Sequence, residues 1–262
     1  MNDAIKGTLG ARLWQARRDG RVIEIADAET PPDEAVSYQV QAEAVVASGH
    51  DRAGWKVGST SLEAQKLLGT SGPGASPVLA PFSYPNGAAI PIYAAHQPAL
   101  EGEFALRFGK DLPVRNEPYE EAEVLDAIDA VAPGLEVVGS RRVGGLFGQG
   151  RMLVNADFGA NIAFAHGDWV SDWRAHDLAA AGVSLIINGE VIAEGTGALA
   201  LGSPLNVAVW LANNLSSRGI GIRAGEFVTT GTCTGVKPVK AGDQVTVDFG
   251  PIGKLEVSFV EA

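Results

Sequence analysis

Three glutamates are the residues of this chain whose spacing best fits a chemical role. Glu101 and Glu103 are separated by one residue, and Glu136 lies between Leu135 and Val137. On an extended strand, residues two apart point to the same face, so we expect the first two carboxylates to lie side by side. Like charges at that spacing repel each other unless a proton or a cation neutralises one of them. Because Mg²⁺ and Mn²⁺ prefer carboxylate oxygens, the trio predicts a divalent metal site.

The neighbours of these glutamates are apolar. Leu100, Phe104 and Leu106 surround the first two. A Glu-x-Glu pair is common on solvated strands, but a carboxylate inside an apolar strand is costly to bury unless it is paired or binds a metal. The context therefore favours a buried site over surface charge.

Lys56 is the candidate catalytic residue. Its neighbours Trp55 and Val57 are apolar, and Gly54 and Gly58 on either side allow a ligand or another strand to approach closely. A lysine in such a place can have a lowered pKa and move protons, or it can bind a carboxylate. The alternative is a lysine at a strand end whose ammonium group reaches solvent.

Segment 229–235 is rich in threonine and glycine. Such a segment can donate backbone N–H groups and hydroxyls to an anion, or it can be an ordinary turn. The four histidines are scattered without the spacing of metal ligands. No phosphate-binding glycine motif and no nucleophile-elbow motif occurs in the chain.

The composition argues against several classes of partner. The net charge is −11, whereas a nucleic-acid partner needs clustered lysine and arginine to neutralise phosphates. No segment is long and apolar enough to predict a membrane span. Cys233 is the single cysteine, which excludes an intramolecular disulfide and favours a buried structural thiol. The N-terminus lacks a basic and then apolar leader, so we expect a cytoplasmic location in a reducing compartment.

The first part of the chain predicts helices. Leu9, Leu13 and Ala16 suit one face of an opening helix that ends at Gly20. A second helix is expected from residues 32–34 to Gly49, with Val36, Val40 and Ala44 as its apolar stripe. Two later helices are expected at about 120–130 and from Ser203-Pro204 to Gly219.

The rest of the chain is dominated by strand patterns. Asn188-Gly189 predicts a hairpin turn between two apolar runs, and residues 245–259 predict a second hairpin. Residues 69–91 are rich in Gly, Pro, Ser and Ala and predict a long loop. Strand clusters separated by a few helices indicate an α+β fold with a mixed or mostly antiparallel sheet.

Together these segments resemble the 2-keto-4-pentenoate hydratase and 4-oxalocrotonate decarboxylase family of the fumarylacetoacetate hydrolase superfamily. The resemblance covers most of the chain, and its motifs occur in the family's order. They are Gly-Trp-Lys-Val-Gly-Ser-Thr-Ser at 54–61, Glu-Gly-Glu-Phe at 101–104, Leu-Glu-Val at 135–137, Ala-Asp at 156–157, Asn-Gly-Glu at 188–190, the segments 197–213 and 224–226, and Gly-Thr at 231–232.

The resemblance implies a β-roll domain at 81–262 and a smaller, mostly helical N-terminal subdomain at 1–80. It implies a Mg²⁺ or Mn²⁺ site formed by Glu101, Glu103 and Glu136, with Lys56 as the catalytic lysine. It further implies a homo-oligomer, or a complex with a related decarboxylase or hydratase. The substrate-binding residues that it implies are Ser61, Arg141, Asp157 and Thr232.

The activity implied is that of a metal-dependent lyase on a 2-oxo or 2-hydroxydienoate carboxylate, with a hydratase of aromatic catabolism as the first choice. A decarboxylase, a C–C hydrolase and a non-catalytic partner subunit are the alternatives. The chain departs from the family at three places. Gly139 stands where an Asp is usual, Phe158 stands where an Asn is usual, and residues 71–77 contain no acid.

Overall fold

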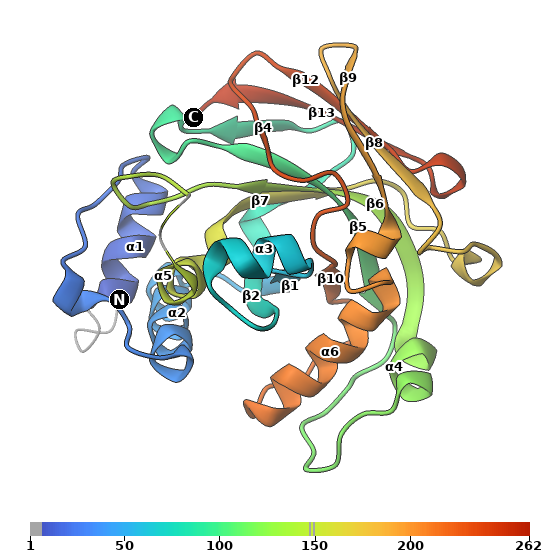
Figure 1. Ribbon diagram of the computed structural model, residues 1–262, viewed down its shortest axis with the longest axis horizontal. Coiled ribbons are helices and arrows are strands. Elements are labelled where there is room, and N and C mark those ends of the chain that lie inside the picture. The colour runs from blue at the N-terminus through green and yellow to red at the C-terminus, as the bar shows by residue number, and fades with distance from the viewer. Residues whose placement is uncertain (1–6, 147, 149) are drawn as a thin grey trace.

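Two β-sheets of different size form the framework of the protein (Figure 1). The computed structural model describes residues 7–146, 148 and 150–262. Over these residues the large sheet has eight strands, with β11 paired to β5 beside the main order, and the small sheet has five. In spatial order the large sheet contains β2 (Gly74–Leu79), β1 (Arg52–Gly58), β10 (Phe227–Thr229), β5 (Ala99–Phe108), β6 (Ile128–Val138), β7 (Asn161–His166) and β3 (Ser83–Pro85), with β11 at Lys237–Pro238. The small sheet contains β4 (Ala89–Ile92), β13 (Lys254–Glu261), β12 (Gln244–Asp248), β8 (Gly182–Ile187) and β9 (Glu190–Thr196).

The helices begin and end at the signals expected from the sequence. Asp33 caps α2 by accepting a hydrogen bond from the Val36 N–H, and Gly49 ends the helix in the left-handed conformation. Ser203 caps α6 in the same way. The α-helices are α1 (Leu9–Arg18), α2 (Glu34–Ser48), α3 (Leu62–Leu68), α4 (Glu121–Ala127), α5 (Arg151–Ala156) and α6 (Pro204–Ser217).

The buried face of α2 differs from the predicted stripe. Ser37, Gln41 and Ala44 are buried, whereas Val36 and Val40 are only half-buried. The Gln41 amide is satisfied inside, because it donates to Ser76 Oγ at 2.7 Å and to the Asn155 carbonyl at 2.6 Å. A polar face is therefore buried because its polar groups have partners.

The long loop predicted at 69–91 is wrong, because that segment contains β2, β3 and β4. All six residues of β2 are buried, so its sequence shows no alternation of apolar and polar residues. The predicted helix at 120–130 is also too long. It ends at Ala127, and Ile128 begins β6.

Both predicted hairpins are confirmed. β8 and β9 are joined through Asn188 and Gly189, whose φ angles of 53° and 84° suit a tight turn between twisted strands. β12 and β13 pair antiparallel from Gln244 opposite Ser258 to Asp248 opposite Lys254.

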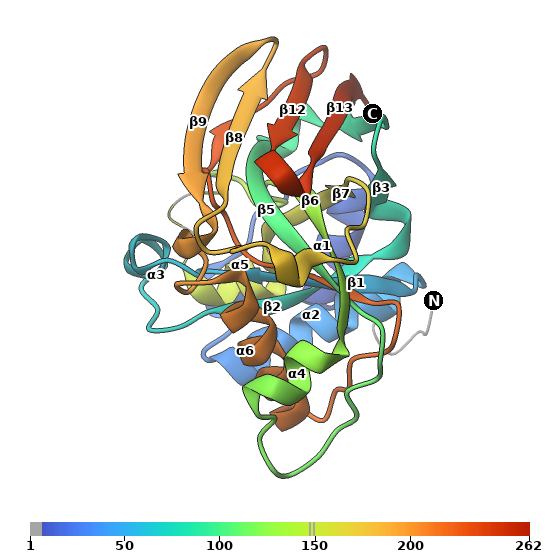
Figure 2. The same cartoon turned by 90° about the vertical axis from the view of Figure 1, so that its right-hand side faces the viewer.

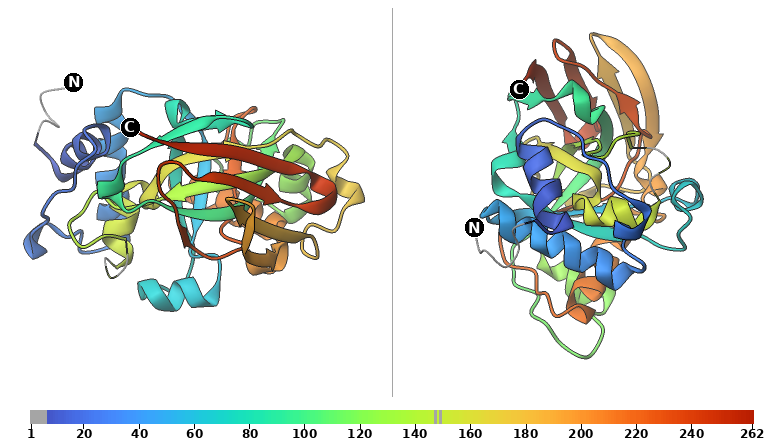
Figure 3. Two further views of the ribbon diagram at one scale, coloured as in Figure 1. Left: turned by 90° about the horizontal axis from the view of Figure 1, so that it is seen from above. Right: turned by 90° about the vertical axis from the view of Figure 1, so that its left-hand side faces the viewer.

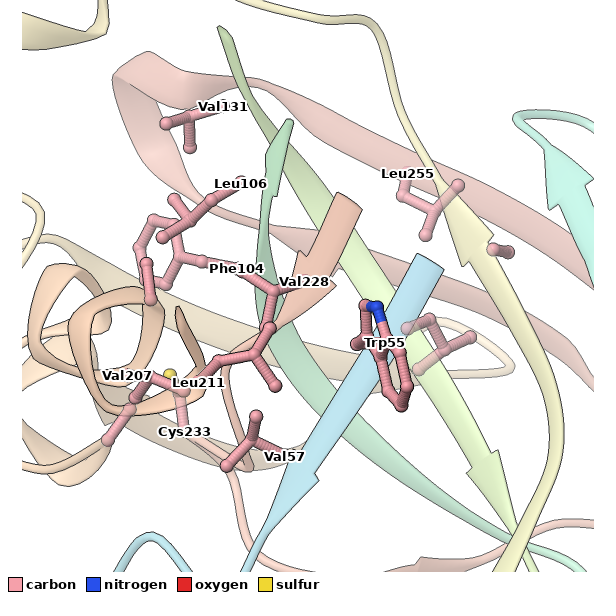
Figure 4. Close-up of a cluster of buried hydrophobic side chains, with 14 of the residues drawn as sticks. Trp55, Val57, Phe104, Leu106, Val131, Val207, Leu211, Val228, Cys233 and Leu255 are labelled. Carbon is pink, nitrogen blue, oxygen red and sulfur yellow. The ribbon is translucent and has the colours of Figure 1, made fainter. Parts of the chain in front are cut away.

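The main core lies between the two sheets and α6. Phe104 of β5 meets Phe249 edge-on, with the ring centroids 4.8 Å apart. Val207 and Leu211 of α6 lie beside Cys233 in this core (Figure 4). Cys233 is a buried free thiol, as expected. Because Phe104 points into this core, Glu101 and Glu103 point to the opposite face of β5.

The large sheet is strongly curved, and Figure 2 shows it between the small sheet above and α4 and α6 below. α1 and α2 cross at one end of the molecule, and α3 projects from its side (Figure 3). The curvature brings the β2 edge near β7 and the short η5 turn (Phe158–Ala160). The concave face of the large sheet is therefore enclosed.

The fold is α+β, with mixed sheets as expected. β1 and β2 come from the first 80 residues, yet they are strands of the large sheet. The division into 1–80 and 81–262 stays a prediction. Within the described residues, none of the helices has the length and apolar character needed to cross a membrane.

Candidate metal centre and its pocket

The register of β5 and β6 brings the three glutamates together. Glu101 lies directly opposite Glu136 in the antiparallel pair, and Glu103 follows two residues later on the same face. Directly opposite side chains have Cβ atoms about 5 Å apart. One carboxylate oxygen from each residue can be chosen so that all three lie within 4.8 Å of one another. The convergence expected from the sequence is therefore present.

The cluster lies in the interior. Glu103 is 1% exposed and Glu136 is fully buried, while Glu101 is half-buried. Burial raises the pKa of Glu101 to about 7, and the charge of Glu136 adds to the shift. The pKa of Glu103 is also raised well above its ordinary value, first by burial and then by the two neighbouring carboxylates. The site therefore favours a bound proton or a cation.

Lys56 of β1 reaches this cluster from the side. Its Nζ lies 3.4 Å from Glu136 Oε2 and donates a hydrogen bond of 2.9 Å to the Gly159 carbonyl. Burial alone would lower its pKa, but the three carboxylates outweigh burial, and the net shift is upward. Of the roles that the sequence left open for Lys56, the structure supports binding of a carboxylate. In the structure that carboxylate is Glu136. The alternative, in which the Lys56 ammonium reaches solvent, is wrong, because Lys56 is only 5% exposed.

Backbone and amide donors fix the glutamates. The Gly231 N–H donates to Glu103 Oε2 at 2.9 Å, and the Asn161 amide donates to Glu136 Oε1 at 3.0 Å. Segment 229–235 thus donates to an anion, and that anion is a carboxylate of the chain itself. These bonds orient the remaining oxygens toward the centre of the cluster.

The η5 turn presents its carbonyl to Lys56 through an uncommon backbone. Phe158, Gly159 and Ala160 have φ angles of 53°, 61° and 68°. Left-handed conformations cost non-glycine residues about 1–2 kcal/mol each, and such strain persists where the surroundings impose it. A Cβ on Gly159 would lie 2.6 Å from Ser76 Oγ and 3.0 Å from Lys56 Cδ. Glycine is therefore required here by space as well as by φ.

The donor set fits a hard divalent cation. Mg²⁺ holds oxygens at about 2.1 Å, so two of its ligands lie at most about 4.2 Å apart. The 4.8 Å spread of the three oxygens is within a small side-chain adjustment of that limit. Among the described residues, the buried Glu136 Oε2 accepts no hydrogen bond, and its partner is the Lys56 ammonium at 3.4 Å, so the oxygen can still bind an ion.

A pocket of about 120 Å³ opens beside the cluster. Lys56 and Glu101 line it, and so do Arg151 and Asn155 of α5. Ala64 and Leu68 of α3 also line the pocket. The cavity thus joins the candidate metal site to a polar region contributed by α5.

Four further residues were expected to bind substrate, and the structure places them around the pocket rather than in its lining. Arg141 and Asp157 form a fully buried ion pair of 2.7 Å. Ser61 caps α3, and Thr232 accepts a hydrogen bond from the Thr234 N–H. Their direct contact with a substrate stays a prediction.

Several residues of the site could not be found from the sequence. Asn161 and Gly159 hold Glu136 and Lys56, but neither lies in a motif that indicates this role. Arg151 and Asn155 reach the pocket only because α5 packs beside β2. The glycine-rich segment before α5 gives no signal for them.

Comparison with known proteins agrees with this geometry. The family described as fumarylacetoacetate (FAA) hydrolase C-terminal matches residues 15–260. The chain is 32% identical to a 2-keto-4-pentenoate hydratase of Paraburkholderia xenovorans (strain LB400), over 94% of this chain and 92% of the relative. It is 31% identical to a 2-hydroxyhexa-2,4-dienoate hydratase of Comamonas testosteroni, over 97% of each chain.

Among solved structures, the chain is similar to a 4-oxalocrotonate decarboxylase from Pseudomonas putida G7 complexed with magnesium and adipate. The TM-score is 0.86 at 30% identity, over 99% of this chain and 98% of that one. The chain therefore belongs to the fumarylacetoacetate hydrolase family, in the branch that contains the 2-keto-4-pentenoate hydratases and 4-oxalocrotonate decarboxylase.

Proposed function

We propose that the protein is a divalent-metal-dependent lyase acting on a 2-oxo or 2-hydroxydienoate carboxylate, and that it is a hydratase of aromatic catabolism. The observation that carries the proposal is the cluster of Glu101, Glu103 and Glu136 within 4.8 Å, with the Lys56 ammonium 3.4 Å from Glu136. Hydratases at 31–32% identity over nearly the whole chain support the reaction class.

Glu101, Glu103 and Glu136 would hold Mg²⁺ or Mn²⁺. Related structures contain magnesium or calcium, which supports a hard cation. When bound, the ion would supply Lewis-acid stabilisation of negative charge that develops on a 2-oxo acid. Because three carboxylates and one ammonium carry two net negative charges, a divalent cation would make the cluster neutral.

The residues of the chain would then have separate tasks. Lys56 keeps its proton because of the nearby carboxylates, so it would hold the substrate carboxylate or donate a proton to the substrate carbon chain. The Gly159 carbonyl and Glu136 fix the position of its Nζ. Apolar groups from α3 would limit the access of water to the pocket. Ser61, Arg141, Asp157 and Thr232 are kept as proposed substrate-binding residues.

A decarboxylase is the second candidate. The structure matches that of a 4-oxalocrotonate decarboxylase with a TM-score of 0.86 over 99% of this chain. Both reactions need the same stabilisation of negative charge beside the carboxylate, so the cluster serves either of them.

The test uses the purified protein alone with Mg²⁺. With 2-hydroxypenta-2,4-dienoate, we expect loss of the dienol absorbance and addition of one water to the product. Release of CO₂ from an oxalocrotonate, without that hydration, would assign the decarboxylase instead. Cleavage of a C–C bond with uptake of water would assign a hydrolase. Inactivity on all three classes, with stable binding to a second chain, would assign a non-catalytic subunit.

We also propose that the protein forms a homo-oligomer or a complex with a related decarboxylase or hydratase. Analytical ultracentrifugation of the purified protein tests the first arrangement, and a monomer at micromolar concentration would contradict it. The cytoplasmic location is part of the same proposal, as is the division into 1–80 and 81–262, which is a division of the chain and not into two units that fold separately. The buried lone thiol of Cys233 is compatible with a reducing compartment.

A further inference from the structure

Arg17 is a buried cation of α1 that the proposed mechanism does not use. Its side chain is 4% exposed, and its guanidinium carbon lies 4.1 Å from the centre of the Phe82 ring and 4.9 Å from that of Phe158. In the described part of the chain, no hydrogen-bond acceptor meets its Nε or Nη1. Burying a charge in this way costs stability, and an apolar side chain would fill the same space at lower cost. Packing alone therefore does not explain an arginine at this position.

The remaining donor of Arg17 reaches the glutamate cluster through Asn161. Its Nη2 donates to the Ile162 carbonyl at 2.7 Å and to Asn161 Oδ1 at 3.3 Å. At the other end of the same amide, Nδ2 donates to Glu136 Oε1 at 3.0 Å and to the Ala163 carbonyl at 3.3 Å. Asn161 is fully buried. A continuous chain of hydrogen bonds thus runs from α1 to a proposed metal ligand.

The orientation of the Asn161 amide decides what Glu136 meets. A side-chain amide has an acceptor end and a donor end of nearly the same size, whereas a guanidinium group only donates. Arg17 therefore pairs only with the orientation that points Oδ1 toward α1 and Nδ2 toward Glu136. Rotation of the amide by 180° would place Oδ1 against Glu136 Oε1, and two acceptors would then face each other. In the observed orientation Oε1 is held, and Oε2 faces the Lys56 ammonium at 3.4 Å.

From these contacts we propose that Arg17 is a positioning residue of the metal centre, which acts through Asn161 to orient Glu136 for cation binding. Helix α1 then contributes to the metal site although none of its residues lines the pocket. This inference rests on the proposed function, because it assumes that the glutamate cluster binds a divalent cation.

The sign of the change in metal affinity separates positioning from charge. Removing a positive charge near a cation site would by itself strengthen Mg²⁺ binding, because like charges repel. Losing the partner that orients a ligand weakens binding, by about 10- to 100-fold for outer-shell groups. By calorimetric titration of the metal-free protein, we expect Asn161→Ala to bind Mg²⁺ about 10- to 100-fold more weakly than wild type. Arg17→Met, one step further from the ion, should bind it about 10-fold more weakly.

A double-mutant cycle tests the route through Asn161. The variant that carries both Arg17→Met and Asn161→Ala should bind Mg²⁺ no more weakly than Asn161→Ala alone, because Arg17 acts through that amide. A loss equal to the product of the two single losses would overturn the inference. Unchanged or tighter binding by Arg17→Met would also overturn it and leave the proposed function standing. Failure of the wild-type protein to bind Mg²⁺ or Mn²⁺ would count against the proposed function and the inference together.

A control on the same helix separates positioning from stability. Leu13 lies one turn before Arg17 in α1, is fully buried and has no hydrogen-bonding side chain. Leu13→Ala should lower the urea midpoint, because it leaves a cavity, and it should keep the wild-type affinity for Mg²⁺. An affinity loss equal to that of Arg17→Met would make the effect a general result of loosening α1 and overturn the role of Arg17.

Arg17→Lys serves if Arg17→Met does not fold. A lysine keeps the buried charge, but its ammonium lies one bond closer to the backbone than Nη2 does, so it cannot reach both acceptors. We expect Mg²⁺ binding about 10-fold weaker than wild type here as well. Wild-type affinity in Arg17→Lys would show that the hydrogen bond to Asn161 is not needed, and it would overturn the inference.

Discussion

The proposed role of the Glu103 carboxylate is to bind the metal ion. Glu103→Gln keeps the size of the side chain and can still accept the Gly231 hydrogen bond. We expect metal affinity to fall by at least about 100-fold, because loss of an outer-shell partner alone costs about 10- to 100-fold, and we expect turnover to fall with it. Calorimetric metal titration and steady-state kinetics measure both.

The fold should survive this change. Because burial and the two neighbouring carboxylates raise the pKa of Glu103, its removal relieves a destabilising charge, and the metal-free melting temperature should not fall. Glu256→Gln, an exposed substitution on β13, is the matched control and should leave metal affinity unchanged. Wild-type turnover in metal-stripped Glu103→Gln protein would contradict the mechanism.

Lys56 is held by Glu136 and by the Gly159 carbonyl, so its substitution removes one charge without opening the metal site. For Lys56→Met we expect turnover to fall by about 10²- to 10⁴-fold, as expected for loss of a positioned proton donor. Metal binding should persist, because the three glutamates remain. Kinetics and metal titration of the same preparation separate these effects. Unchanged kinetics would assign Lys56 a structural role.

The pKa of Glu101 predicts how metal binding depends on pH. Its pKa in the folded protein is about 7, above the ordinary 4.5. The neutral acid is favoured without metal, so in metal-free protein its contribution to stability is complete below about pH 4.5 and is lost as pH rises to about 7. A metal ion needs the charged form, so metal affinity should rise with pH, by up to about tenfold per unit for one proton released.

Melting temperatures with Mg²⁺ and with a chelator, from pH 5 to 8, test this dependence. We expect the stabilisation by Mg²⁺ to increase with pH across this range, because Glu101 ionises near pH 7 and the pKa of Glu103 is raised as well. A stabilisation that is the same at every pH would contradict the assignment of Glu101 as a metal ligand.

At the scale of elements, the η5 turn connects backbone conformation to the chemistry of Lys56. Gly159→Ala requires a left-handed alanine and a close contact with Ser76 Oγ. We expect a loss of unfolding free energy above the roughly 1–2 kcal/mol that the backbone conformation costs, together with a fall in turnover. Urea denaturation and steady-state kinetics measure the two effects.

Gly219→Ala is the matched control for this turn. Gly219 has a φ of 73° after α6, and a Cβ there would contact nothing within 4 Å. This variant should lose stability by the backbone cost alone and keep full turnover. Equal losses of stability and equal turnover in the two variants would mean that η5 does not position Lys56.

The elements themselves were predictable to different degrees. α2 and α6 have capping residues at their ends, and the β8–β9 hairpin has Asn-Gly, so local sequence was sufficient for them. β2 was missed because a strand buried on both faces shows no alternation, and its small residues resemble a loop. The left-handed η5 turn was missed because two of its three residues are not glycine.

At the scale of the whole molecule, the site depends on pairings that no local pattern encodes. The sequence predicts that Glu101 and Glu103 share a face, but Glu136 joins them only through the register of β5 with β6. Lys56 lies three strands away from β6 in the sheet order, so it reaches Glu136 only because the sheet is curved. That Glu136 and Lys56 join the two other glutamates was expected from the resemblance to a family, because the spacing of residues along a strand does not encode it.

The same curved sheet predicts that residues 81–262 do not fold by themselves. β1 is an interior strand between β2 and β10, and removing residues 1–80 exposes the edge of β10 and deletes Lys56. Removing residues 1–49 deletes α1, α2 and the short turn η2 (Asp27–Glu29), and it leaves every strand named above in place. We therefore expect the fragment 50–262 to unfold cooperatively at lower urea concentration than the full chain, because it loses the contacts of Trp14 with Phe82 and Phe158.

The fragment 81–262 should show no cooperative transition in circular dichroism and no metal-induced stabilisation, although all three glutamates remain in it. The reason is that β10 is only three residues long and, without β1, is paired on one side alone, so it cannot hold the edge of a curved sheet closed around buried carboxylates. A cooperative transition in 81–262 equal to that of the full chain would instead make this region an independent domain, with the first 80 residues added to a sheet that is already complete.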